Sequence, residues 1–145
     1  MDWKKEAIED LGRYQMMKIG LKNLNEELQT LELTCADAPA ALRREPVVQG
    51  GAKAADDALL QRIVRRDKLS ASRDALRATL RRIDRALKAL SEEERCVLTR
   101  FYIERAPGAA LLLCAQLRYE QAHIYRIKDA ALKKFTIAMY GSEQI

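Results

Sequence analysis

The chain has 145 residues, of which 48% are hydrophobic, 32% are charged and only 6% are aromatic. This length suffices for one ordinary domain, or for a small domain joined to an extended element. Alanine, leucine, arginine, lysine and glutamate are abundant. Because these residues favour helix, the composition predicts an all-α fold and argues against a sheet.

The net charge of +5 and the pI of about 9.2 fit a polyanionic partner. Residues 1–35 hold five Lys/Arg and seven Asp/Glu, a net charge of −2, whereas residues 54–90 hold ten and five, a net charge of +5. Residues 36–53 and 91–145 each add +1. The excess positive charge therefore lies within residues 54–90.

The residues offer little for metal binding, catalysis or membrane insertion. Cys35, Cys96 and Cys114 have no C-x-x-C spacing and the chain has a single histidine, so we expect no zinc site and no cofactor. The sequence has no glycine-rich phosphate loop and no nucleophile with a histidine partner, so we expect no enzyme. It shows no signal-peptide pattern and no apolar run near the roughly 18 residues of a membrane span. We expect a cytoplasmic protein without a membrane partner.

The first predicted helix covers residues 2–34. Its apolar residues recur at spacings of three and four: Trp3, Ala7, Leu11, Tyr14, Met17, Leu21, Leu24, Leu28 and Leu31. This pattern is typical of a coiled-coil seam rather than of a broad globular face.

The periodicity stops over residues 36–53, where Pro39, Pro46, Gly50 and Gly51 interrupt an alanine-rich stretch. Proline and glycine at this density predict a flexible connection. A connection of this length is unusual inside a compact domain, so we expect it to be mobile or to be used for contacts.

A second helix is predicted over residues 54–90. Its seam consists of Leu69, Leu76, Leu80, Ile83, Leu87 and Leu90. Two helices of about 50 Å each, one acidic and one basic, most simply fold into an antiparallel hairpin. Neither helix can bury its stripe alone, so we also expect a homodimer or another homo-oligomer through these helices.

Many arginines lie along the second helix: Arg62, Arg65, Arg66, Arg73, Arg77, Arg81, Arg82 and Arg85. They could contact phosphate, but pairing with Glu26, Glu27 and Glu32 of the first helix is the favoured interpretation.

Residues 91–145 form a second predicted domain, distinct from the hairpin of residues 1–90. Ser91 and Glu94 have the spacing of a capping box, which starts a helix that ends near Arg105. Pro107 and Gly108 separate it from a short helix over residues 109–117. A third helix covers residues 120–140 and ends at Gly141. Its predicted buried face is Ile124, Ile127, Ala131, Leu132 and Phe135.

Three short helices with tight connections, the last rich in polar residues, are the parts of a helix-turn-helix DNA-binding domain. The base-facing positions on the last helix are Gln121, Ala122, Tyr125 and Arg126. Glutamine suits adenine and arginine suits guanine. Contacts to the phosphate backbone are predicted for Arg118, Tyr119, His123, Lys128, Lys133 and Lys134.

The stretch from Leu90 to Tyr102 resembles the start of region four of bacterial sigma factors, and the stretch LRYEQAHIYRIKDAALKKF resembles the recognition helix of that region. The whole chain resembles phage and prophage regulators with a region-four-like domain, related to the late transcriptional regulators ArpU and RinA. Within the turn, Arg118 stands where the sigma family usually has glycine. Gln121 and Ala122 stand where sigma factors commonly have arginine and glutamate.

The resemblance implies a phage-type transcriptional regulator of late genes, encoded by a phage or prophage, that binds double-stranded DNA and contacts RNA polymerase. Two alternatives remain open. A DNA-packaging factor of the small-terminase kind also joins a helix-turn-helix to helical oligomerisation segments. A helical adaptor would use the same three-helix domain to bind a protein and never DNA.

Overall fold

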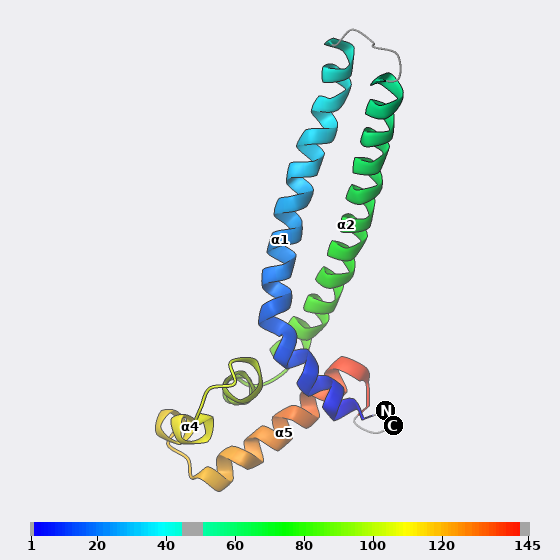
Figure 1. The fold of residues 1–145 in the computed structure, drawn as a ribbon. Coiled ribbons are helices and arrows are strands. Elements are labelled where there is room, and N and C mark those ends of the chain that lie inside the picture. Colours follow the sequence, from blue (N-terminus) through cyan, green and yellow to red (C-terminus); the bar gives the residue numbers. More distant parts are fainter. Residues whose placement is uncertain (1, 45–50, 143–145) are drawn as a thin grey trace. The chain divides into compact units, whose positions relative to one another are not determined.

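The computed structural model describes residues 2–44 and 51–142, with side chains over 2–34 and 54–142. Every regular element in these ranges is a helix (Figure 1). In chain order they are α1 (Trp3–Arg44), α2 (Gly51–Lys88), α3 (Glu92–Leu98), the π-helical turn η1 (Thr99–Ile103), α4 (Ala109–Leu117) and α5 (Gln121–Tyr140). The predicted all-α class is confirmed for the part of the chain described.

The first helix continues well beyond its predicted end and stops at Arg44. The predicted loop is therefore wrong for residues 36–44 and 51–53, which are helical, while residues 45–50 lie outside the described residues. The stretch ADAPAALRR that extends α1 is rich in alanine, leucine and arginine, the residues with high helix propensity. Their combined propensity outweighs the cost of the single interior Pro39.

The contacts between Cα atoms divide the chain into two units. The terminal unit comprises Met1–Lys18 and Ala78–Ile145, and the middle unit comprises Ile19–Arg77. Because α1 and α2 each contribute residues to both units, the division crosses the two long helices.

In the middle unit α1 and α2 lie side by side and run in opposite directions (Figure 1). The Leu76 side chain lies next to Gly20, where an added Cβ atom would be in van der Waals contact with it. Further along α1, the carboxylate of Glu27 forms an ion pair with Arg65. This ion pair is one of those predicted between the arginines of the second helix and the glutamates of the first. Among the described side chains of this unit, only Leu28 is buried.

In the terminal unit the first turns of α1 pack against the last turns of α5 (Figure 1). The rings of Trp3 and Tyr140 stack with their centroids 4.8 Å apart, and the Tyr140 hydroxyl donates a hydrogen bond to Asp10. Burial and this hydrogen bond raise the pKa of Tyr140. From α2, Arg82 donates to the backbone carbonyl of Met139 at 2.9 Å. These contacts hold the C-terminal half of α5 against both long helices.

Most predicted seam residues of the terminal unit are buried, namely Ala7, Leu11 and Tyr14 of α1, Leu80, Ile83 and Leu87 of α2, and Leu90 just after it, whereas Trp3 and Met17 are partly buried. The C-terminal half of α5 also contributes the buried residues Ala131, Leu132, Phe135 and Met139. Gly12 belongs to the same part of α1, and a Cβ at this position would overlap the guanidinium group of Arg105. The glycine therefore makes room for a side chain that lies far away in the sequence.

The capping box is confirmed. The Ser91 hydroxyl accepts from the Glu94 amide at 3.2 Å, and the Glu94 carboxylate accepts from the Ser91 amide at 3.2 Å. The helix that starts here changes character before its predicted end at Arg105. It widens into η1, where the Glu104 amide donates to the Thr99 carbonyl at 2.8 Å. An apolar pattern does not distinguish such a short π-helical turn from continuous α-helix.

Candidate nucleic-acid interface

The helices α3, α4 and α5 share a small core. Val97, Leu113 and Ile124, one residue from each helix, are fully buried and pack together. The partly buried residues around them are Cys96, Phe101, Cys114, Leu117, Tyr119 and Ile127. This core fixes the first two turns of α5 relative to the two shorter helices.

A three-residue turn joins α4 to α5. Arg118 ends α4 in the left-handed backbone conformation, with φ 60°, and its amide donates to the Cys114 carbonyl at 3.0 Å. The Tyr119 hydroxyl donates to Glu93 at 2.8 Å, and the Tyr119 ring meets the edge of His123 with centroids 4.5 Å apart. The turn is therefore fixed by contacts to both α3 and α5.

Replacing Arg118 with glycine is expected to leave the fold unchanged and to raise the free energy of unfolding by up to about 1 kcal/mol. An L-residue in the left-handed region is strained, whereas glycine adopts it without steric cost. Thermal denaturation of the purified variant measures the change. A loss of more than about 1 kcal/mol would contradict this account of the turn, because it would mean that the Arg118 side chain stabilises it.

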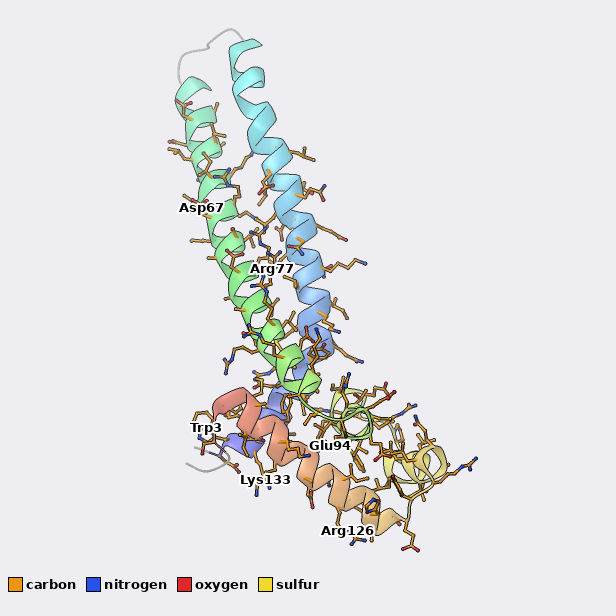
Figure 2. All side chains as sticks on the ribbon, turned by 180° about the vertical axis from the view of Figure 1, so that it is seen from behind. Trp3, Asp67, Arg77, Glu94, Arg126 and Lys133 are labelled. Atoms are coloured by element: carbon orange, nitrogen blue, oxygen red, sulfur yellow. The ribbon has the colours of Figure 1, made fainter. Side chains whose placement is uncertain are left out.

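The predicted base-facing residues lie together on the first two turns of α5. Gln121, Ala122, Tyr125 and Arg126 are all exposed, whereas Ile124 on the opposite side is fully buried. Arg126 lies towards the N-terminal end of α5 (Figure 2). Its guanidinium group makes a long contact of 3.4 Å from Nε to the Ala122 carbonyl. This surface, called the reading face below, can therefore offer one amide and one guanidinium group to a ligand.

Lys128, a predicted phosphate contact, lies over two aromatic rings. Its ammonium nitrogen is 4.9 Å from the centroid of Tyr125 and 5.2 Å from that of Phe101, and the two rings are themselves 5.8 Å apart. A cation over ring faces is attracted by their quadrupoles. Lys128 therefore helps to orient Tyr125, and the position of this charge is set by the protein.

Two further predicted phosphate contacts, Lys133 and Lys134, are exposed on α5, and Figure 2 labels Lys133 on this helix. Lys134 forms an ion pair of 3.0 Å with Glu94 of the capping box. Burial raises the pKa of the Glu94 carboxyl, but the bonds from Lys134 and Ser91 outweigh it, so the net pKa lies below its ordinary value. The charge of Lys134 is thus neutralised within the protein.

The outer face of α4 is apolar. This helix contains no charged residue, and its side chains Leu111 and Leu112 are 69% and 48% exposed. Of the three consecutive leucines, only Leu113 is buried. A phosphate backbone offers no apolar contact to such a surface, so the outer face of α4 is better suited to a protein.

Sequence reasoning missed two residues that support the reading face. Glu93 holds Tyr119 of the turn, and Phe101 lies beneath Lys128 and Tyr125. The acidic first turn of α3 indicates the start of a helix but not the partner of the Glu93 carboxylate. The apolar spacing that includes Phe101 indicates the buried side of a helix but not the residues that pack on it.

Neither the family models, nor the curated proteins, nor the solved structures compared with this chain include a match. The likeness to sigma region four therefore stays a prediction. Over residues 2–44 and 51–142, no helix is both long and apolar enough to cross a membrane. In the same ranges, histidine, cysteine, aspartate and glutamate form no group of three or more that could hold a metal ion.

Proposed function

We propose that this chain is a sequence-specific DNA-binding regulator of transcription, of the type that phages use for their late genes. In this proposal α4 and α5 act as a helix-turn-helix, α5 enters the major groove, and its first two turns meet the base edges. The protein also contacts RNA polymerase and acts as a homo-oligomer.

One observation carries the proposal: a short helix, a three-residue turn and a longer helix share one core and leave the polar start of the longer helix exposed. A helix-turn-helix needs such a recognition helix, anchored on one side and open on the other. On this helix, Gln121 can bond adenine and Arg126 can bond guanine in the major groove. The other exposed residues, Ala122 and Tyr125, can make apolar contacts to thymine methyl groups.

Contacts within the free protein limit the electrostatic part of its affinity for DNA. Four cationic side chains are predicted to contact phosphate: Arg118, Lys128, Lys133 and Lys134. When the logarithm of the DNA-binding constant is plotted against the logarithm of the salt concentration, each phosphate contact adds about −0.9 to the slope. Lys128 lies over aromatic rings and Lys134 is paired with Glu94, so both must exchange partners to contact phosphate. We therefore expect a slope between about −2 and about −4 per reading helix.

The proposal is tested by titrating the full chain into labelled duplexes from its own upstream and neighbouring DNA, at two salt concentrations and with unrelated duplex as competitor. Binding that survives the competitor, with a slope in this range, is the expected result. Absence of duplex binding at low salt would contradict the proposal. Binding that the unrelated duplex abolishes would contradict sequence specificity.

A second candidate function is a helical adaptor that binds another protein through the three-helix domain. The uncharged α4 favours it, because its side chains Leu111 and Leu112 are exposed and apolar. In the regulator proposed above, the same surface would contact RNA polymerase. A Leu111→Glu variant separates the two functions: it should keep DNA binding if the chain is a regulator.

A further inference from the structure

A carboxylate lies on the exposed side of α5 directly after the reading face. Asp129 is exposed, and it follows Ala122, Tyr125 and Arg126 at spacings of seven, four and three residues. Residues at these spacings share one side of a helix. The exposed stripe of α5 therefore continues from the reading face through Asp129.

The π-helical turn η1 borders this carboxylate. Burial and then the negative charge of Asp129 raise the pKa of the Tyr102 hydroxyl. The ring of Tyr102 lies 6.3 Å from that of Phe101, which in turn lies 5.8 Å from the ring of Tyr125. Asp129 and Tyr125 therefore lie beside the same pair of aromatic residues, and the protein presents them together.

We propose that Asp129 is a further base-reading residue and that it selects cytosine. This inference rests on the proposed function, because it requires α5 to lie in the major groove. The phosphates of DNA repel a carboxylate, so Asp129 favours binding only where it accepts a hydrogen bond from a base. The base donors in the major groove are the amino groups of cytosine and adenine, and aspartate suits the amino group of cytosine.

The spacing of the two charged side chains places this cytosine beside the guanine that Arg126 is proposed to read. Asp129 lies about 4.5 Å further along the helix than Arg126, because an α-helix rises about 1.5 Å per residue. Successive base pairs are about 3.4 Å apart, which is a similar step. The cytosine therefore belongs to a base pair next to the one that Arg126 reads.

Asp129 acts more by excluding wrong bases than by adding affinity. In the major groove guanine and thymine present acceptor oxygens, which repel a carboxylate and leave it without a donor. The selection also depends on the reading face, because Gln121 and Arg126 hold α5 in register with the bases. When these two contacts are lost, Asp129 has no fixed base to meet.

The test uses the specific duplex found by titration, with each of its base pairs replaced singly, and measures binding by fluorescence anisotropy. For the wild type, replacing one C·G pair should weaken binding about tenfold. Asp129→Ala should lose this preference and bind unrelated duplex about two- to fivefold more tightly, because it removes a negative charge. Asp129→Asn should change the preference at the same pair from cytosine to adenine, which asparagine suits.

Asp57→Ala is the matched control, because Asp57 is an exposed carboxylate of α2 and not part of the stripe on α5. It should keep the wild-type preference at every pair. An unchanged preference for cytosine in Asp129→Ala would overturn the inference. If that variant also melts at a lower temperature, the carboxylate only stabilises the contact with η1. A wild type that does not distinguish its own site from unrelated duplex would instead contradict the proposed function, and this inference with it.

Discussion

Replacing Phe135 with alanine is expected to lower the free energy of unfolding by about 3–5 kcal/mol. Phe135 is the largest side chain that the structure buries completely, and it lies in the half of α5 that packs against the long helices. Its removal costs the transfer free energy of the ring and leaves a cavity that α5 can fill only by moving. Because single domains are stable by only about 5–15 kcal/mol, the loss is a large part of the total.

Urea denaturation followed by circular dichroism measures this loss. Ile137→Ala is the matched control, because it shortens an apolar side chain of the same helix at a position that is 43% exposed. The control should lose less than about 1 kcal/mol. A similar loss for both variants would mean that α5 does not pack on its predicted buried face.

The sequence was sufficient to predict most of the helices, because their signals are local. The seams of α1 and α2 follow spacings of three and four, and the residues Leu80, Ile83, Leu87 and Leu90 are buried as that pattern predicts. The start of α3 follows from a capping box of two residues. The end of α5 at Gly141, which has φ 75°, follows from the tolerance of glycine for this conformation.

The features that the sequence prediction missed or got wrong are not local. They depend either on the summed helix propensity of many residues or on contacts between residues that are far apart in the sequence. The prediction of a loop over residues 36–53 gives too much weight to Pro39. It gives too little weight to the summed helix propensity of the alanine, leucine and arginine residues around Pro39. The stacking of Trp3 on Tyr140 joins the two ends of the chain and leaves no local pattern. Gly12 makes room for Arg105, and no local pattern in α1 indicates that contact.

The candidate site was predictable in its positions but not in its electrostatics. Helical periodicity alone places Gln121, Tyr125 and Arg126 on one exposed face, as the structure has them. The partners of Lys128 and Lys134 come from η1 and α3, so their pairing with Phe101 and Glu94 could not be seen in the spacing of α5. How many of these charges have partners within the free protein therefore does not follow from the sequence of α5.

Removing both polar groups of the reading face should abolish sequence preference while leaving the fold intact. A good bidentate contact to a base discriminates by about 1–3 kcal/mol, so Gln121→Ala with Arg126→Ala should weaken specific binding at least about 30-fold. Binding to unrelated duplex should weaken far less, because phosphate contacts supply it. Both side chains are exposed, so circular dichroism should show unchanged helix content.

The most direct test of DNA recognition by α5 is the ratio of specific to nonspecific affinity, measured by fluorescence anisotropy for the wild type, the double variant and Arg62→Ala. Arg62 is an exposed arginine of α2 and not part of the reading face, so this control removes one arginine charge without changing that face. We predict a high ratio for the wild type and for Arg62→Ala, and a ratio near one for the double variant. An unchanged ratio in the double variant would contradict the assignment of this face to DNA.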